Sequence, residues 1–302
     1  MKSKPLLSVI LPTVNRNKYL VHTVQQVLDD KFKDLEVIVV DQSDEHDKDT
    51  IAYFADNKDP RLRFYTVAPI SGVAAKNFGL IKARADIVVF LDDDILLEPD
   101  CLTMHYKAYK EHPDIGGTGG RVKQDGIQTT KELLKFNKYG LSGYNSFNYI
   151  GPAAYTDTVP GGNMSVKRDE AIRVGGFDTN FLRSQHREES EFSDRYHKAG
   201  NKFYFEPKAC IVHLAAPYGG TRIKIDFADS HDFYKNNWYF VLRYVRWYNL
   251  PLAFIKQLRF YVLRKDIKLT LHRLVLFIWG LAVAIKRCIL PIKTISHEVV
   301  ND

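Results

Sequence analysis

Three consecutive carboxylates, Asp92, Asp93 and Asp94, directly follow the apolar run VVFL at 88–91. Adjacent carboxylates repel one another and burial makes each of them harder to ionise, so the pattern calls for a cation nearby. Because alternate side chains of an extended segment point the same way, Asp92 and Asp94 should share one face. Paired carboxylates suit a hard divalent cation such as Mn²⁺ or Mg²⁺. By spacing alone, a solvated acidic loop or a helix cap explains the triplet equally well.

These carboxylates need a scaffold, and the first 115 residues alternate strand-like and helix-like patterns. Near-continuous runs of Val, Ile and Leu are typical of parallel strands covered on both faces. The predicted strands span 6–11, 35–40, 62–66 and 87–91. Apolar residues at helical spacing between 20 and 28, and the segment 72–85, predict helices between these strands. The order predicts an α/β fold with a doubly wound, mostly parallel sheet.

Polar residues follow three of the predicted strands at the point where each ends. The turn from Pro12 to Asn15 follows the first, Asp41 follows the second, and the Asp triplet follows the fourth. Ligands of doubly wound sheets bind beyond the carboxyl ends of the strands. The sequence therefore predicts a binding site at this edge of the sheet.

The composition of the chain changes after residue 115 and again after residue 225. Glycine pairs recur from 116 to 225, with a predicted helix at 188–199 and short strands at 202–205 and 209–212, and we expect this part to form a lobe over the sheet edge. From 226 to 302 the pattern is helical, aromatic and basic. The predicted organisation is a catalytic domain over 1–225, divided into halves at 1–115 and 116–225, and a helical segment over 226–302.

The order of short motifs resembles the family-2 glycosyltransferases with a GT-A fold, over about residues 6 to 215. The motifs are SVILPTVNR at 8–16, VIVVDQSD at 37–44, GVAAKNFGL at 72–80, VVFLDDD at 88–94, PGGNMSVKR at 160–168, GGFD at 175–178, REESEFSDR at 187–195 and His213. Each motif is short, and their common order carries the resemblance. It implies a Rossmann-like nucleotide-binding half and an acceptor-side half.

The resemblance implies that one group of residues holds a nucleotide-diphospho-sugar. These residues are Pro12, Thr13, Asn15, Asp41, Lys76, Asn77, Asp92 and Asp93. It also implies that Asp94 and Asp92, completed by His213, bind Mn²⁺ or Mg²⁺. Taken alone, Lys76 is as well explained as a solvated lysine, and a lone histidine after a strand is more often structural.

On the acceptor side, the resemblance implies a loop of Gly161, Gly162 and Asn163, where missing Cβ atoms let backbone approach sugar. A plain turn is the alternative. Glu188 and Glu189 stand where the family has a Glu-Asp pair, so Glu189, one methylene longer than the usual Asp, is the expected base. Two acids at a helix start also favour the helix dipole. Arg222 is a candidate diphosphate contact or a solvated arginine.

These parts imply a metal-dependent, inverting transfer of sugar to a hydroxyl of a glycan or lipid-linked acceptor, in polysaccharide or glycolipid biosynthesis. No covalent intermediate is expected. Two alternatives stay open: a nucleotide-sugar- or glycan-binding protein without turnover, which the Glu189 departure supports, and phosphoryl transfer on an aspartate. The latter family has Thr or Val two places after its second Asp, and this chain has Leu96.

The C-terminal segment carries the basic charge of the chain. From Lys235 to Ile295 there are twelve Lys and Arg against one acid, Asp266, a net charge of +11, and the remainder has −4. Interleaved aromatic residues suit an anionic membrane interface. The longest apolar run, 274–285, is shorter than the ~20 residues that span a bilayer. We expect interfacial helices, with helices packed on the catalytic domain as the alternative, and no nucleic-acid partner.

The chain has three widely spaced cysteines, Cys101, Cys210 and Cys288, which fit neither a disulfide framework nor a zinc site. Reduced thiols indicate a cytosolic compartment. The N-terminal apolar run meets Pro12 at once and has no small-residue cleavage site, so it is better explained as a strand than as a signal peptide. The expected location is cytoplasmic, peripheral at the inner face of the cell membrane.

Overall fold

The computed structural model describes residues 4–68, 71–133, 135–140, 146–181, 186–221, 230–263, 267–292 and 295. The first half contains β1 (Leu7–Thr13), α1 (Lys18–Asp29), β2 (Leu35–Asp41), α2 (Lys48–Asp56), β3 (Leu62–Thr66), α3 (Gly72–Lys82), β4 (Ile87–Leu91), β5 (Ile95–Leu97) and α4 (Cys101–Glu111). Then come β6 (Gly117–Lys123), η1 (Ser146–Asn148), β7 (Ala154–Thr156), β8 (Asn163–Lys167), α5 (Arg168–Arg173), α6 (Glu188–Lys198) and β9 (Phe203–His213). The C-terminal helices are α7 (His231–Tyr244), η3 (Trp247–Asn249), α8 (Leu250–Gln257), the π-helical η4 (Leu258–Val262) and α9 (Ile267–Cys288).

The N-terminal half of the sheet is parallel, as the sequence predicts. Its strands lie in the order β3-β2-β1-β4, and β1 pairs with both β2 and β4. The register places Val9 beside Val37 on one side and Val89 on the other. Since parallel strands in register end at one edge, the polar residues after β1, β2 and β4 come together there.

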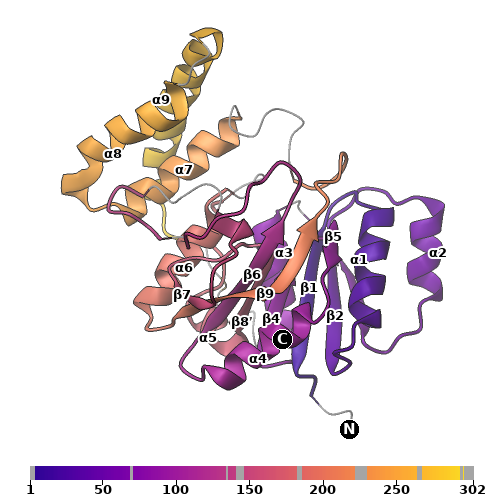
Figure 1. Cartoon of the computed structure of the whole chain (residues 1–302). Helices are drawn as coiled ribbons and strands as arrows, with labels where there is room; N and C mark the ends of the chain where they lie inside the picture. The colour runs from indigo at the N-terminus through magenta and orange to yellow at the C-terminus, as the bar shows by residue number, and fades with distance from the viewer. Residues whose placement is uncertain are drawn as a thin grey trace.

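Two apolar layers cover the faces of this sheet, which explains the continuous apolar runs. Consecutive residues of β1, such as Val9 and Ile10, enter different core clusters because successive side chains of a strand point to opposite faces. Helices α1 and α4 cover one face, and α3, α6 and α7 contribute to the other cluster. Figure 1 shows α1 and α2 on the right flank of the sheet. The expected α/β architecture is confirmed.

The second half of the chain extends the same sheet, so the expectation of a lobe over the sheet edge was wrong in this respect. Strand β8 pairs antiparallel with β4, β6 lies between β8 and β9, and β5 returns to the far edge of β9. The two short strands predicted at 202–205 and 209–212 form one strand, β9, whose pairing with β6 shifts register between Gly120 and Arg121. Glycine-rich, short segments concealed these strands because they lack apolar periodicity.

The C-terminal helices pack on one another and on the sheet domain. Helix α9 lies so close to α7 that a Cβ on Gly280 would come within 2.8 Å of Tyr234. The hydroxyl of Tyr239 donates to Asp178 Oδ2 over 2.6 Å, which ties α7 to the sheet domain. Trp238, Tyr239 and Phe240, which the sequence placed among the interfacial aromatics, are buried. In Figure 1 these helices stand at the upper left, away from the N-terminus.

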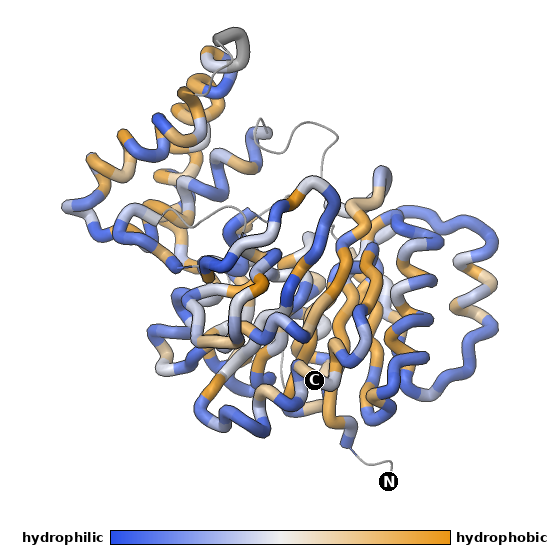
Figure 2. The backbone as a smooth tube through the Cα atoms, in the orientation of Figure 1, coloured by the Kyte–Doolittle hydropathy of each residue, from blue (hydrophilic) through white to orange (hydrophobic). Residues whose placement is uncertain are grey.

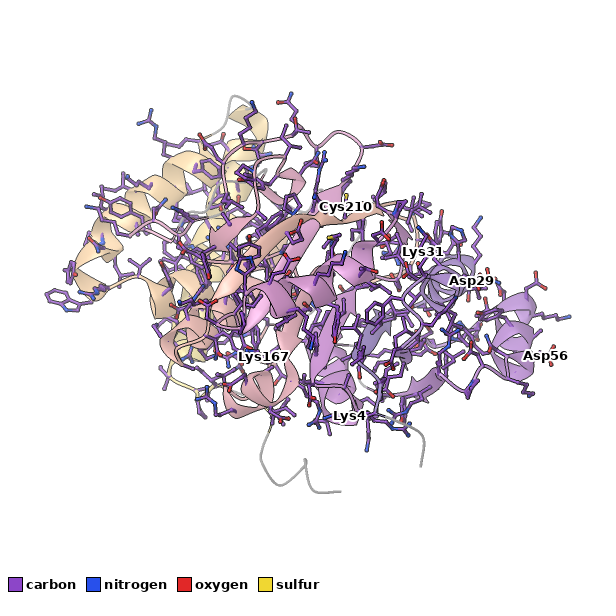
Figure 3. The ribbon with its side chains drawn as sticks, turned by 60° about the horizontal axis from the view of Figure 1, so that its bottom comes forward. Lys4, Asp29, Lys31, Asp56, Lys167 and Cys210 are labelled. Atoms are coloured by element: carbon purple, nitrogen blue, oxygen red, sulfur yellow. The ribbon has the colours of Figure 1, made fainter. Side chains whose placement is uncertain are left out.

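The described cysteines are free, with Cys101 and Cys210 buried. Figure 3 labels Cys210 on β9, with Asp29 and Lys31 at the end of α1 and Asp56 at the end of α2. The expected boundary at 225/226 lies outside the described residues. Among the helices that the structure describes, none is long and apolar enough to cross a membrane.

Candidate active site

A cavity of about 480 Å³ opens at the carboxyl ends of the parallel strands. Its walls come from the turn after β1, the start of α3, the Asp triplet after β4, the end of β6, the glycine loop before β8, the start of α6 and the segment after β9. Among the residues expected from the sequence, the cavity is lined by Pro12, Thr13, Lys76, Asp92, Asp93, Asp94, Gly161, Gly162, Glu188, Glu189 and His213. The fold thus brings most of the predicted residues to one place.

Asp92 and Asp94 both face His213, as the alternation of an extended segment predicts, but their side chains differ in exposure. Asp92 keeps 45% of its side chain exposed, whereas that of Asp94 is 1% exposed. Pairing of β5 with β9 sets Ile95 opposite His213, so the imidazole lies beside the triplet. His213 Nε2 is 3.3 Å from Asp94 Oδ1 and 3.8 Å from Asp92 Oδ2. Both carboxylates therefore lie within 4 Å of the same imidazole nitrogen.

Arg16 supplies positive charge beside the Asp triplet. The sequence analysis did not select this residue. Its guanidinium is buried and lies 3.4 Å from Asp93 and 3.3 Å from Asp94. Burial raises the pKa of Asp93 to about 7 although Arg16 opposes the shift. Asp93, expected among the residues that hold the nucleotide-diphospho-sugar, is buried against Arg16. The need for charge balance was the signal that could have identified this arginine.

Asp94 remains ionised in spite of its burial. Burial favours the neutral carboxyl, but the hydrogen bond and charge of His213, the charge of Arg16 and the backbone N–H of Ala216 together lower the pKa of Asp94. Arg16 also donates to the carbonyl oxygens of Ala216 and Tyr218. The segment after β9 is therefore closed onto the turn after β1 through Arg16 and Asp94.

His213 is held by Gln124, another residue that sequence reasoning missed. His213 Nδ1 lies 3.0 Å from Gln124 Oε1. An amide oxygen only accepts hydrogen bonds, so the N–H at Nδ1 donates to Gln124, and Nε2 faces Asp92 and Asp94. Nothing in the local sequence singles out Gln124, because its position depends on the parallel pairing of β6 with β9.

The donor set fits a divalent cation. In the described part of the chain, no three His, Cys, Asp or Glu side chains are grouped as they stand so that they could hold a metal ion. However, adjacent ligands of an octahedral ion at about 2.1 Å lie about 3 Å apart, close to the 3.3 Å between His213 and Asp94. An imidazole nitrogen and two carboxylates are ligands that Mn²⁺ accepts.

A buried ion pair joins α3 to α6 at the other wall of the cavity. Lys76 Nζ lies 2.9 Å from Glu188 Oε1, and both side chains are 6% exposed. Burial opposes the charge of Lys76, but Glu188, with Asp92 and Glu189 further away, raises the pKa of Lys76. Lys76 is thus no solvated lysine. Arg195, on the same helix as Glu188, binds Glu191 and not this pair.

Glu189 differs from its neighbour in its environment. It lines the cavity but is only partly exposed. Burial, and then the negative charge of Glu188, raise the pKa of Glu189 well above its ordinary value. A carboxylate with a raised pKa binds a proton more strongly, which suits a general base.

The glycine loop makes room for side chains of this protein. A Cβ on Gly162 would lie 2.0 Å from Asp92 Oδ2, and a Cβ on Gly161 would lie 3.0 Å from Lys76 Nζ and 3.1 Å from Glu188 Oε1. The sequence analysis attributed these glycines to the approach of sugar. Their immediate role in the structure is to seat Asp92 and the Lys76–Glu188 pair.

Four expected site residues do not line the cavity because local hydrogen bonds occupy their side chains. Asp41 accepts from Ser43 and pairs with His46, and Asn15 Oδ1 accepts from the backbone of Asp44. The Asn77 amide binds both backbone groups of Phe177. Asn163 donates to the carbonyls of Arg121 and Ala209 and contacts His105, so it holds β6 and β9 together. Near β2, Gln42 lines the cavity instead of Asp41.

Other lining residues also escaped the sequence analysis, namely Phe147, His186 and Thr221. Arg222, the candidate diphosphate contact, lies outside the described residues. His186 stacks on Phe233 of α7 with 4.4 Å between ring centroids. The cavity wall therefore reaches the C-terminal helices.

The C-terminal helices also hold the residue that precedes the two glutamates. Arg187 adopts a positive φ of 74° at the start of α6. Its guanidinium lies 3.3 Å from Asn237 of α7 and 3.2 Å from the hydroxyl of Tyr261, and it faces the ring of Phe240. Packing of the helices thus orients the first turn of α6.

Comparison with known proteins places this geometry in a family. The family model described as Glycosyl transferase family 2 matches residues 8–168. This segment includes the Asp triplet and the glycine loop and ends before the two glutamates and His213.

Two curated relatives extend the comparison. The chain is 26% identical over 221 residues to a glucosyl-dolichyl phosphate glucuronosyltransferase of Haloferax volcanii, which covers 70% of each chain. It is 34% identical over 119 residues to a GalNAc(5)-diNAcBac-PP-undecaprenol beta-1,3-glucosyltransferase of Campylobacter jejuni, which covers 37% of this chain and 38% of the relative. Among solved structures, GalNAc-T7 with UDP, GalNAc and Mn²⁺ has a TM-score of 0.66 at 15% identity, over 95% of this chain and 58% of that one.

Proposed function

Because the chain belongs to glycosyl transferase family 2, and is a glycosyltransferase, we propose that it uses a divalent cation to move sugar from a nucleotide-diphospho-sugar to an acceptor hydroxyl with inversion. One observation carries the proposal. Asp92, Asp94 and His213 converge on one side of the cavity that Glu189 also lines. A cation site and a base within one cavity are what this reaction requires.

Asp92, Asp94 and His213 would hold the cation, and Gln124 fixes the imidazole so that Nε2 faces it. Bound there, Mn²⁺ or Mg²⁺ supplies Lewis-acid stabilisation of the departing nucleoside diphosphate. GalNAc-T7, a structural neighbour, is described with UDP and Mn²⁺. The nucleotide lies along the polar turn formed by Pro12 and Thr13, with Gln42 at the end of β2.

Glu189 acts as the general base. It accepts the proton of the acceptor hydroxyl as that oxygen attacks the anomeric carbon. The bond from this carbon to the diphosphate oxygen breaks on the opposite face, so the configuration inverts and no covalent enzyme intermediate forms. Glu188 does not compete for this role because its carboxylate is paired with Lys76. The ion pair keeps the first turn of α6 in place.

The acceptor in this proposal is lipid-linked, and the chain works at the inner face of the cell membrane. Support comes from the two curated relatives, whose names contain a dolichyl phosphate and an undecaprenol diphosphate carrier. The wall of the cavity at His186 packs on Phe233 of the C-terminal helices. An acceptor could therefore approach along these helices.

A donor panel tests the reaction. Purified chain is incubated with nucleotide-sugars and polyprenyl-phosphate acceptors in Mn²⁺, Mg²⁺ or EDTA, and nucleoside diphosphate release is followed. We expect release with one donor class that EDTA abolishes and Mn²⁺ restores, and a product anomer opposite to that of the donor by NMR. Full activity in EDTA would refute the metal, and a retained anomer would refute the single displacement.

A further inference from the structure

Helix α9 carries apolar residues on two opposite faces. Its inner face, which includes Leu276, Phe277 and Ala284, is buried, and Phe277 packs on Trp238 of α7. The outer face carries an outer stripe at alternating spacings of four and three residues: Leu271, Val275, Ile278, Ala282 and Ile285, continued by Ile289 in the turn after α9. This spacing aligns the side chains along one side of a helix.

The outer stripe is strongly exposed. Leu271 is 70% exposed, Val275 59%, Ile278 50%, Ile285 49% and Ile289 80%. A helix that packs one face on a protein core usually carries polar residues on the other. Contiguous apolar exposure of this kind marks a contact surface. Figure 2 shows hydrophobic segments along the C-terminal helices, interleaved with hydrophilic ones.

The neighbouring segment, from Trp247 of η3 through α8 and η4 to Leu263, adds exposed side chains of the same kind. Trp247 is 80% exposed, Ile255 59% and Leu263 59%. Lys256 and Arg259 are exposed between them. Large aromatic and aliphatic side chains bordered by Lys and Arg are the composition of helices that lie in a membrane interface.

We propose that the outer stripe, with the exposed face of α8 and η4, docks the protein on an anionic lipid bilayer. Charge decides between a bilayer and a second copy of the chain. The segment from Lys235 to Ile295 has a net charge of +11, so two copies meeting through it would repel each other. An anionic leaflet attracts each basic residue by about 1 kcal/mol.

The same geometry sets the orientation of the protein. The inner face of α9 is packed on α7, so only the outer stripe is available to lipid, and α9 lies along the membrane plane. His186 and Phe233 connect α7 to the wall of the cavity. Docking through α9 therefore keeps the cavity near the leaflet that would hold a lipid-linked acceptor. Lipid binding itself does not depend on the proposed transfer reaction.

Vesicle sedimentation of the full chain tests this surface. The vesicles contain phosphatidylcholine alone or with phosphatidylglycerol, and the test variant is Ile278→Asp with Ile285→Asp. A matched control carries Ile51→Asp with Ile127→Asp, two exposed isoleucines of the sheet domain. All four sites are exposed, so circular dichroism should show folded proteins. Nucleoside diphosphate release without vesicles is measured in parallel and should be the same in each.

We expect the wild type and the control to bind anionic vesicles. The test variant should bind at least ~10-fold more weakly, because it lacks two isoleucines that would be buried in the bilayer on binding. Added salt should weaken the binding of the wild type. Equal binding of test variant and wild type would overturn the proposal. The proposal would also be overturned if the wild type did not bind anionic vesicles but formed a dimer, while the test variant was a monomer.

Discussion

Two regions depart in opposite ways from the usual distribution of charged and apolar residues between interior and surface. One is the site edge, the edge of the sheet where the carboxyl ends of the parallel strands form the cavity. The other is the outer stripe of α9. At the site edge, the charged side chains of Arg16, Lys76, Asp94 and Glu188 are almost fully buried. On α9, aliphatic side chains such as Leu271 lie in solvent. Interiors normally exclude charges, and exposed apolar patches are normally small. We propose a cation and a nucleotide as the partners of the first region, and lipid as the partner of the second.

The buried charges at the site edge should be costly to disturb singly. We expect Lys76→Met to lower the free energy of unfolding by ~3–5 kcal/mol, because it leaves Glu188 buried without its partner. Chemical denaturation measures this loss, with Lys107→Met on the exposed face of α4 as the control. Combining Lys76→Met with Glu188→Leu should restore most of the stability. A Lys76→Met protein as stable as the control would mean that the pair is not buried in solution.

Gly162 gives a sharper local test of the site edge. Gly162→Ala places a Cβ 2.0 Å from Asp92 Oδ2 and must displace that carboxylate. We expect Mn²⁺ affinity, measured by calorimetry, to fall by ~10-fold or more. Because Asp92 is partly exposed and can rotate away, the melting temperature should change little. In an Asp92→Ala background, Gly162→Ala should have no further effect on affinity, and an additional loss would show that the glycine acts through another group.

The raised pKa of Glu189 predicts the acid limb of the pH profile. Turnover requires the ionised base, so below the pKa of Glu189 the rate should fall about tenfold per pH unit. Burial and the charge of Glu188 raise this pKa. Glu188→Gln removes the neighbouring charge, so the limb should move to lower pH. An unmoved limb, or a movement to higher pH, would show that another group controls it.

The same shift affects stability with a definite sign. Between the ordinary pKa of a glutamate and the raised pKa of Glu189, the folded protein binds more protons than the unfolded chain. The contribution of Glu189 to the free energy of unfolding therefore falls as pH rises through this window. Glu189→Gln should remove that dependence, which denaturation at several pH values would detect.

The smallest expected effect concerns the contact between the C-terminal helices and the start of α6. Tyr261→Phe removes the hydroxyl that lies 3.2 Å from Arg187. We expect a loss of ~1 kcal/mol in stability and a lower kcat with an unchanged KM for donor, since only the start of α6 is loosened. Tyr248→Phe, at an exposed tyrosine of the same helices, is the control. If both variants show wild-type kcat, the C-terminal helices do not position α6.

The parallel half of the fold was predictable from sequence because each strand there is buried on both faces and reads as an apolar run. Strand β9 was divided in two because its centre, Glu206 to Lys208, is polar and irregular. The sequence pattern did not locate helix α2, because this helix has no buried apolar stripe: Thr50 is its one buried residue. Core aromatics of α7, such as Trp238, were predicted to lie at a membrane interface, because aromatic spacing alone does not show which face of a helix packs on the core.

Asp92 and Asp94, whose positions depend on one strand end, line the cavity at the edge of the sheet where the sequence placed them. Positions that depend on long-range pairing were missed, as for Gln124, which reaches His213 through the pairing of β6 with β9. Asn77 and Asn163 carried the chemistry of a binding residue but are used by backbone groups of Phe177, Arg121 and Ala209. Side-chain chemistry in the sequence does not reveal such local competition.

The division of labour between Asp94 and Glu189 is the central claim, and one paired measurement tests it most directly. Nucleoside diphosphate release and Mn²⁺-dependent donor binding are measured for Asp94→Ala and Glu189→Gln, with each variant checked for folding. We expect Asp94→Ala to lose both release and metal-dependent binding. Glu189→Gln should bind donor as the wild type does and lose ~10²–10⁴-fold in turnover with acceptor. Normal turnover by Glu189→Gln, or undiminished metal-dependent binding by Asp94→Ala, would contradict the account.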